Sequence, residues 1–213
     1  MYALNDLDEK ALKYIEKFQI SDKFFIEAGA NDGICQSNTA MLEFHYGWRG
    51  VLVEPNLENY QKAVATRRNS SVYRAALVSD LHEGETIKGI FSADSTNRWN
   101  GLCSGVTENH LLEFPEWVCD VPAMTLNKIL DDCRAPTQIG LFSLDVEGYE
   151  LDVLRGLDTE KWRPKMIMME IAQHYDEEVL HKHMEFMSKI DYAFYENMSP
   201  NDFLFLDSRI IKV

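Results

Sequence analysis

Two acidic residues stand at the ends of two short apolar runs near the start of the chain. The first run leads through Glu27 into a turn with Gly29 and Gly33, and the second run, residues 50–53, is followed by Glu54. A strand, a glycine turn, a helix and a second strand ending in an acid are typical of a nucleotide-binding βαβ unit. In such a unit the glycines let the backbone approach a ligand closely. The acid can accept hydrogen bonds from the hydroxyls of a ribose.

The spacing inside the turn discriminates between cofactors. A dinucleotide fingerprint has the pattern G-x-G-x-x-G, which places a pyrophosphate at a helix N-terminus. This chain instead has Glu27 at the strand end and Asn31 where the second glycine would stand. A carboxylate there would repel a pyrophosphate but would attract the ammonium group of an amino-acid-like ligand. The turn therefore favours S-adenosylmethionine over NAD, and an NAD-dependent oxidoreductase stays as the alternative because Glu54 suits both.

Two later apolar runs also end in acids. Asp145 follows residues 139–144, and Glu170 lies near the end of residues 165–171. In a parallel sheet the carboxyl ends of the strands share one edge, and ligands bind beyond that edge. Carboxylates crowded at such an edge are destabilising unless a cation joins them. A sulfonium, an ammonium group or a divalent metal would each serve.

The elements that position these acids follow from the apolar periodicity and the turn residues. The sequence predicts helices over residues 6–18, from Ser37 or Asn38 to Tyr46, over 57–68 and 125–132, from Asp145 to about 157, and over 177–190; it predicts strands over 24–28, 51–54, 71–78, 87–91, 139–144 and 165–171, and a closing hairpin of 193–196 and 203–206. This alternation predicts an α/β fold with a mostly parallel sheet and helices on both faces.

Length and rhythm predict one domain over residues 1–213. Residues 1–22 are expected to form an N-terminal helical segment. Residues 80–121 interrupt the alternation and are expected to contain a strand plus a binding loop or lid.

The composition excludes some classes of function. A net charge of −14 argues against a nucleic-acid-binding surface, which needs clustered Lys and Arg. The four cysteines show neither C-x-x-C pairing nor zinc-like spacing, so free thiols in a reducing compartment are expected. The N-terminus lacks the pattern of a signal peptide and no apolar run is long enough to span a bilayer, so we expect a cytoplasmic protein without a membrane partner.

The chain resembles a known family in four segments. Residues 26–33 (Ile-Glu-Ala-Gly-Ala-Asn-Asp-Gly), 47–55, 121–130 and 144–156 (Leu-Asp-Val-Glu-Gly-Tyr-Glu-Leu-Asp-Val-Leu-Arg-Gly) are similar to the FkbM-type methyltransferases, the last being the most specific. The resemblance implies the Rossmann-like class I methyltransferase fold, with about seven strands and an antiparallel hairpin at one edge. It also implies S-adenosylmethionine as cofactor and methyl transfer to an oxygen, usually a hydroxyl of a sugar or natural product. A lysine often found just before the D-V-E-G motif is absent, because Ser143 and Leu144 stand there.

The resemblance also implies roles for single residues. Those implied to hold the methionine part of the cofactor are Glu27, Gly29, Asn31, Asp32 and Gly33. Glu54 would bind the ribose, Asn56 would lie against the adenine, and the segment with Ala75 and Ala76 would close the adenine pocket. Asp145 would face the amino group or the reacting methyl. Asn31 and Asp32 also suit a plain turn, and we expect Glu147 and Glu150 to be first-turn acids that complement a helix dipole.

A hydroxyl acceptor needs a base, and the candidates are Asp145, Glu170 and His174. A Mg²⁺ ion held by the oxygens of Asp145 and Glu170 is an alternative. The acceptor is expected to be a small molecule or a carbohydrate. Trp99, the polar segment 92–107 and the aromatic tail residues Tyr192, Phe194 and Tyr195 are candidates to contact it.

Two other functions were weighed. Methylation of an amino group on DNA is disfavoured, because the expected Pro-Pro-aromatic turn is replaced by the D-V-E-G segment and the net charge is wrong. A catalytically silent protein of the same fold, used for binding, would be free to lose the acids at the strand ends, and here all four are present.

Overall fold

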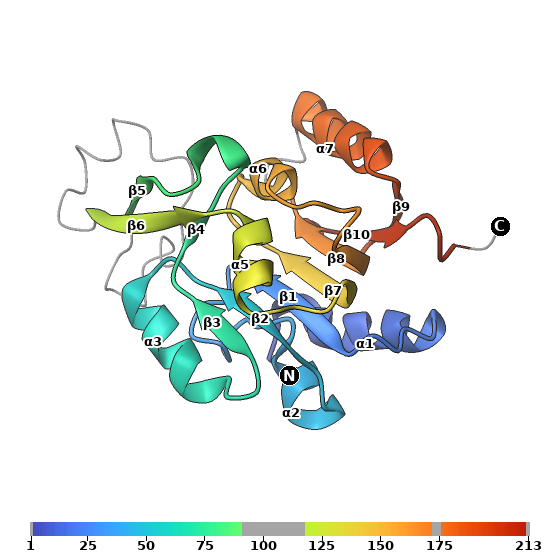
Figure 1. The fold of residues 1–213 in the computed structure, drawn as a ribbon. Helices are drawn as coiled ribbons and strands as arrows, with labels where there is room; N and C mark the ends of the chain where they lie inside the picture. The colour runs from blue at the N-terminus through green and yellow to red at the C-terminus, as the bar shows by residue number, and fades with distance from the viewer. Residues whose placement is uncertain (1, 91–117, 172–175, 212–213) are drawn as a thin grey trace.

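The fold was examined in a computed structural model, which describes residues 2–90, 118–171 and 176–211 (Figure 1). The elements in chain order are η1 (Leu4–Asp6), α1 (Leu7–Lys17), β1 (Phe24–Ala28), α2 (Ala40–Tyr46), β2 (Arg49–Val53), α3 (Leu57–Thr66), β3 (Ser71–Tyr73), β4 (Ala76–Leu77), η2 (Asp80–His82), β5 (Thr86–Ile90), β6 (Val118–Met124), α5 (Leu126–Asp132), β7 (Gln138–Leu144), α6 (Glu150–Arg155), β8 (Arg163–Glu170), α7 (Glu177–Lys189), β9 (Tyr192–Asn197) and β10 (Asp202–Asp207). The predicted alternation of strands and helices is confirmed.

The main sheet has seven strands in the order β3-β2-β1-β7-β8-β10-β9. The first five are parallel to their neighbours, whereas β10 is antiparallel to both β8 and β9. The order reverses at β1, which lies between β2 and β7. The predicted mostly parallel sheet with an antiparallel hairpin at its edge is therefore confirmed.

The register brings the ends of the central strands level with one another. Ala28 at the end of β1 pairs with Val53 on one side and with Leu144 on the other. Leu144 in turn pairs with Met169, one residue before the end of β8. Because β10 runs antiparallel, it begins at this same edge, where Asp202 pairs with Glu170. The carboxyl ends of the parallel strands and the turn of the hairpin therefore lie at the same edge of the sheet, where ligands are expected to bind.

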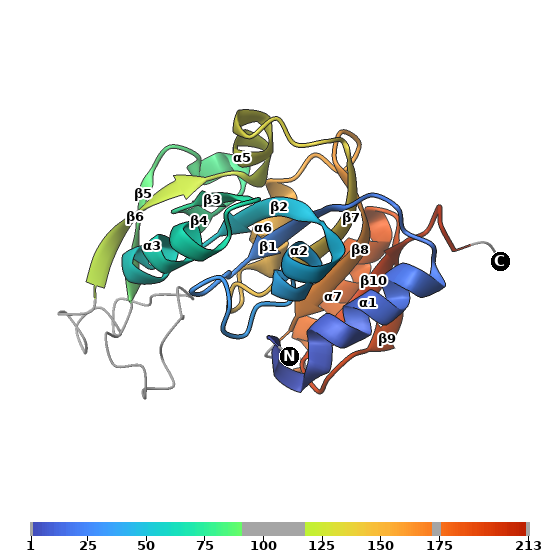
Figure 2. The ribbon, with the colours of Figure 1, turned by 90° about the horizontal axis from the view of Figure 1, so that it is seen from below.

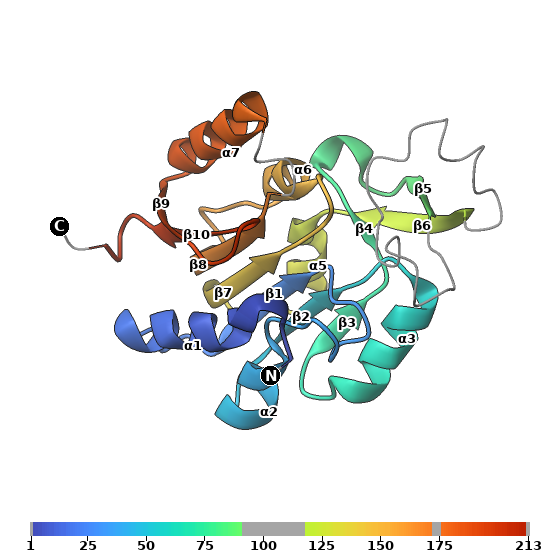
Figure 3. The same ribbon diagram turned by 180° about the vertical axis from the view of Figure 1, so that it is seen from behind.

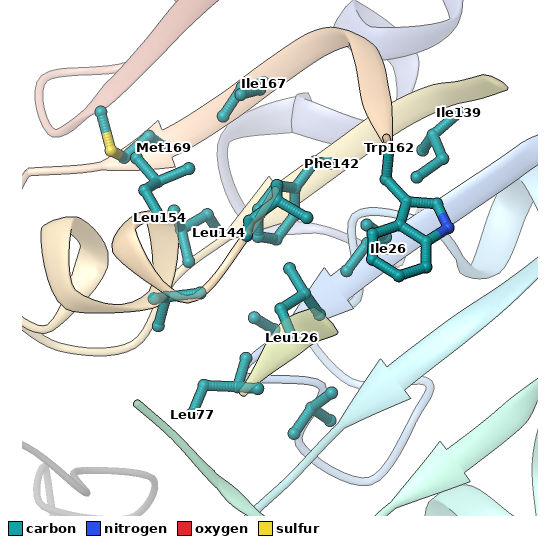
Figure 4. Close-up of a cluster of buried hydrophobic side chains, with 14 of the residues drawn as sticks. Ile26, Leu77, Leu126, Ile139, Phe142, Leu144, Leu154, Trp162, Ile167 and Met169 are labelled. Carbon is teal, nitrogen blue, oxygen red and sulfur yellow. The ribbon is translucent and has the colours of Figure 1, made fainter. Parts of the chain in front are cut away.

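Helices cover both faces of this sheet. On one face, seen in front in Figure 2, α1 and α2 pack through Ala11, Ile15 and Leu42 against strand residues that include Phe25. On the other face, α5, α6 and α7 enclose the larger core, whose packing of Ile26, Phe142 and Ile167 against Leu126 and Leu154 is drawn in Figure 4. Alternate residues of β1 therefore face opposite layers, as strand geometry requires.

A second, three-stranded sheet was not predicted. The expected strand 71–78 is divided, so that β3 joins the main sheet while β4 pairs with β6. β6 lies in a segment that the sequence analysis left without a strand, and it pairs antiparallel with β5. Figure 3 shows this small sheet at the end of the molecule away from β9. Residues 91–117, which contain most of the predicted binding loop, lie outside the described residues.

Local details differ modestly from the predictions. The N-cap of α2 is Thr39 rather than Ser37 or Asn38, although the Ser37 hydroxyl accepts a hydrogen bond from the Ala40 N–H at 3.0 Å. Gly47 ends α2 with a φ of 70°, as predicted. Within the described residues, Cys35, Cys119 and Cys133 carry free thiols. No helix in the described part of the chain has both the length and the apolar character needed to cross a bilayer.

Candidate functional site

The candidate site begins where β1 and β7 end side by side. The Asp145 N–H donates to the Ala28 carbonyl at 3.1 Å, so the segment after β7 stays against β1 beyond the last ladder pair. Gly29 has a φ of 81°, and a Cβ on it would lie 1.9 Å from the Asp145 carbonyl oxygen. Only glycine fits this position, because any side chain would force the two strand ends apart.

A cavity of about 210 Å³ opens beside this contact. It unites four of the predicted cofactor residues, namely Gly29, Glu54, Ala76 and Asp145. The remaining lining is largely apolar and comes from β2, the segment with β4, β5 and the turn after β7: Val53, Pro55, Ala75, Leu77, Val78, Ile87, Lys88, Val146 and Tyr149. The cavity could therefore pack its apolar wall against a flat apolar group and accept hydrogen bonds from a polar group near Glu54.

Glu54 is held by the backbone of two turns. Its Oε2 accepts the Asn31 N–H at 2.8 Å and its Oε1 accepts the Asn56 N–H at 2.8 Å. The side chain is buried, and this burial raises the pKa of the carboxyl to about 7, against the lowering effect of the two N–H groups. Each oxygen keeps a further lone pair, so the carboxylate can still accept from ribose hydroxyls.

Glu27 does not line this cavity. It follows Phe25 in the alternation of β1 and points to the opposite layer, where it accepts hydrogen bonds from Ser37, Asn38 and Thr39. The Arg67 guanidinium lies 3.3 Å from its Oε2. This placement corrects the prediction that a ligand's ammonium group lies beside Glu27, because the cation that neutralises Glu27 is the protein's own Arg67.

Arg67 is a residue that sequence reasoning missed. It is buried, it pairs with Glu43 through its Nε at 2.9 Å, and its Nη1 donates to the Gly33 carbonyl at 3.0 Å. A Cβ on Gly33 would lie 2.8 Å from the Arg67 Cγ, so the glycine turn rests directly on this side chain. No local pattern distinguishes a buried arginine from an exposed one near the end of a helix.

The other turn residues serve the turn rather than the cavity. Asn31 adopts a φ of 50° and offers its N–H to Glu54. The Asp32 carboxylate accepts the N–H groups of Ile34 and Cys35 at 2.9 and 2.7 Å, which is the plain turn role considered above. Asn56 caps α3 by accepting the Asn59 N–H at 3.0 Å. The predicted contacts of Asn31, Asp32, Gly33 and Asn56 with a cofactor stay predictions.

Three carboxylates gather next to the cavity. One oxygen from each of Asp145, Glu147 and Glu170 lies within 4.8 Å of the others. Burial, and then the charge and hydrogen bond of Glu170, raise the pKa of Asp145 well above its ordinary value. Burial and the charges of Glu170 and Glu150 raise the pKa of Glu147 to about 7. Glu147 is therefore partly protonated near neutral pH, and the three neighbouring carboxylates can together hold, accept or release a proton.

Glu147 was predicted to be a first-turn helix acid, and this is wrong. Its φ of 57° places it in the turn before α6, so its carboxylate turns toward Asp145. Glu150 begins α6 and accepts the N–H groups of Val146 and Gly148 at 3.3 and 2.9 Å. That acid therefore has the structural role that was expected of it.

The predicted acceptor and base residues other than Asp145 and Glu170 either fall outside the described residues or lie away from the cavity. His174 and Trp99 lie outside the described residues. Tyr192 is buried, with its hydroxyl donating to the Pro164 carbonyl at 2.7 Å. Tyr195 packs on Phe18, the residue after α1, with ring centroids 5.3 Å apart. Tyr192, Phe194 and Tyr195 line neither this cavity nor the second one described below.

Comparison with known protein families identifies the family of this chain. The methyltransferase FkbM domain family matches residues 27–194, which is most of the chain. The chain belongs to the FkbM methyltransferase family. This match includes the glycine turn, Glu54 and Asp145, and it favours the methyltransferase interpretation over the oxidoreductase that Glu54 alone left open. No curated protein matches the chain.

Two solved structures were compared with this FkbM family chain, and the first of them shares its fold. A provisionally assigned O-methyltransferase from Klebsiella pneumoniae superposes with a TM-score of 0.50 at 12% identity, covering 96% of this chain and 80% of that one. A SAM-dependent methyltransferase from Aquifex aeolicus gives a TM-score of 0.47 at 8% identity, covering 96% and 92%. At these identities the likeness to the first shows the fold alone. Family and fold together support an S-adenosylmethionine-dependent methyltransferase.

Proposed function

We propose that the chain transfers a methyl group from S-adenosylmethionine to a hydroxyl oxygen of a small molecule or carbohydrate. The observation that supports this proposal is that Asp145 both lines the first cavity and belongs to the cluster of three carboxylates. On one side of Asp145 lies the cavity with Gly29, Glu54 and an apolar wall, and on the other lie Glu147 and Glu170.

The cavity suits the cofactor in three ways. Glu54 offers lone pairs suited to two ribose hydroxyls, and the segment with Ala76 provides an apolar surface for the adenine. Negative charge at Asp145 would favour a nearby ammonium or sulfonium group.

When bound, S-adenosylmethionine supplies an electrophilic methyl group, so that an O–CH₃ bond forms, the S–CH₃ bond breaks and its electron pair remains on sulfur. The hydroxyl proton must then leave the acceptor oxygen, and a placed base is worth roughly 10²–10⁴-fold in rate. We assign this base to the Asp145–Glu170 pair, which share a hydrogen bond and whose mutual repulsion favours taking up a proton. Holding the acceptor in line with the methyl group would contribute much of the remaining acceleration, up to about 7–11 kcal/mol.

A metal-assisted version uses the same side chains. Mg²⁺ prefers carboxylate oxygens, and Asp145, Glu147 and Glu170 bring one each within 4.8 Å. Turnover that survives excess EDTA would assign the proton to the carboxylate pair. Turnover that is lost with EDTA and restored by Mg²⁺ would assign activation of the acceptor to the metal.

Calorimetric titration with S-adenosylhomocysteine tests the cofactor assignment. We expect the wild-type protein to bind it and the Glu54→Ala protein to bind it at least tenfold more weakly, because Glu54 is the buried acceptor in the cavity. Glu58→Ala, an exposed glutamate on α3, is the matched control and should bind normally. Absence of binding to the wild type, or unchanged binding in Glu54→Ala, would refute the assignment.

A screen of hydroxylated acceptors with isotopically labelled S-adenosylmethionine tests the reaction. Label transferred to oxygen supports the proposal, whereas label transferred only to nitrogen or carbon contradicts it. A protein that binds the cofactor but methylates nothing in the screen would favour the catalytically silent alternative.

A further inference from the structure

A second cavity, of about 270 Å³, lies on the other side of Asp145 from the first one. Five separate segments of the chain build it. The N-terminal turn contributes residues such as Asn5, the loop after β1 contributes Asn38, and the ends of β7 and β8 meet the β9–β10 turn. Asp145 is the residue that this cavity shares with the cofactor cavity.

The register of the sheet explains the carboxylates in this cavity. Leu144 pairs with Met169, so Asp145 and Glu170 follow at the same level on adjacent strands. Asp202 pairs directly with Glu170 across the antiparallel ladder. Asp145, Glu170 and Asp202 therefore stand in one row, running from the cofactor side into the second cavity.

The β9–β10 turn that ends this row is firmly held. The Met198 N–H donates to the Asp202 carbonyl at 2.8 Å, and the Ser199 hydroxyl donates to the Asp202 carboxylate. Lys10 of α1 donates to the Met198 carbonyl at 2.6 Å. The turn is thus fixed to the N-terminal helix before any ligand arrives, as a preorganised binding site requires.

The chemistry of the lining distinguishes between classes of ligand. The described lining contains three carboxylates, four side-chain amides and a hydroxyl, and it contains no Lys, Arg or His. Carboxylates and amide oxygens accept hydrogen bonds from hydroxyl and ammonium groups. A carboxylate or phosphate on a ligand would meet the like charge of these carboxylates, which is unfavourable in a partly buried site. The nearby cation, Lys10 of α1, does not line the cavity and already interacts with Asp202 and the Met198 carbonyl.

We propose that this second cavity receives the methyl acceptor, and that it selects a hydroxyl-rich acceptor bearing an ammonium group over one bearing a carboxylate or phosphate. The inference rests on the proposed function, since it places the reacting hydroxyl at Asp145 and the ammonium group toward Asp202. Asp202 is then a specificity-determining residue at the far end of the carboxylate row.

Three probes with the same ring test the charge selection: methyl glucoside, methyl glucosaminide and methyl glucuronide. Each is titrated into the protein saturated with S-adenosylhomocysteine. We expect the glucosaminide to bind most tightly and the glucuronide most weakly. Asp202→Asn should weaken glucosaminide binding about tenfold or more, because hydrogen bonds to charged groups are the strong ones.

Two further variants test whether the effect is specific to this cavity. Asp131→Asn makes the same chemical change at an exposed site on α5 and should leave glucosaminide binding unchanged. Asn5→Gly removes an amide from the N-terminal turn while suiting its φ of 53°, and it should weaken binding of all three probes. Circular dichroism and S-adenosylhomocysteine affinity report whether each variant is folded.

The inference is overturned if the glucuronide binds as tightly as the glucosaminide, or if Asp202→Asn and Asn5→Gly both bind the probes normally. It is also overturned if a protein that binds S-adenosylhomocysteine binds none of the probes. Failure to bind S-adenosylhomocysteine at all is a different result, because it overturns the proposed function first.

Discussion

Replacing Glu54 by Gln should change how stability depends on pH. In the unfolded chain the Glu54 carboxyl loses its proton near its ordinary pKa of 4.5, whereas burial in the folded protein raises that pKa to about 7. The folded state therefore holds this proton more tightly. The resulting stabilisation is fully present below pH 4.5 and is lost as the pH rises through 7. At about 1.36 kcal/mol per pH unit, the loss amounts to about 3 kcal/mol by pH 8.

The amide that replaces the Glu54 carboxyl cannot titrate, so this loss is absent from the variant. The amide nitrogen would face one of the two N–H donors that now bind the carboxylate, at a cost of about 1–3 kcal/mol that does not vary with pH. The unfolding free energy of the variant minus that of the wild type should therefore rise by about 3 kcal/mol between pH 4.5 and pH 8, whatever its starting value. Other titrating carboxyls such as Asp145 cancel in this difference.

Urea unfolding at a series of pH values, without cofactor, measures the difference by linear extrapolation. Glu58→Gln, which changes an exposed carboxylate on the neighbouring helix, should give a nearly constant difference over the same range. A constant difference for Glu54→Gln as well would refute the reasoning that burial holds the proton on this group.

Three further predictions concern the packing and chemistry around the site. Arg67→Met should lower the unfolding free energy by about 3–5 kcal/mol, because it leaves the carboxylates of Glu27 and Glu43 buried without a cation. A loss below about 1 kcal/mol in urea unfolding would contradict this. Gly29→Ala should destabilise the protein more than Gly47→Ala in thermal unfolding. Both glycines have a positive φ, which costs alanine about 1–2 kcal/mol, but only the Cβ at position 29 would clash with the backbone of Asp145. Equal losses would show that the strand ends can separate. The rate constant kcat should rise with pH as the Asp145–Glu170 pair loses its proton, and Asp145→Asn should remove that rise, so a pH–rate profile unchanged in the variant would exclude the pair as base.

Local patterns in the sequence predict the order of the elements and four of the residues that line the first cavity. The alternation of apolar runs and helical stripes predicted nearly every described strand and helix. The glycine turn predicts Gly29, the strand-end acids include Glu54 and Asp145, and the family resemblance implies Ala76. The structure brings all four to one cavity. The order of the elements and the meeting of these four residues follow from local patterns and from the rule that parallel strands share one carboxyl edge, whereas their contacts with a cofactor stay predictions.

The partners of each acid became apparent only from the packing of distant segments. Glu27 was assigned to a ligand because it ends a strand, but the alternation of β1 turns it to the layer where Arg67, 40 residues further on, neutralises it. β6 and the division of residues 71–78 depend on pairing between distant segments. Asp202 reached the carboxylate row through the antiparallel register of β10. Strand pairing and the partner of a buried charge are long-range choices, settled by which distant surfaces pack together, and a single sequence carries no local signal for them.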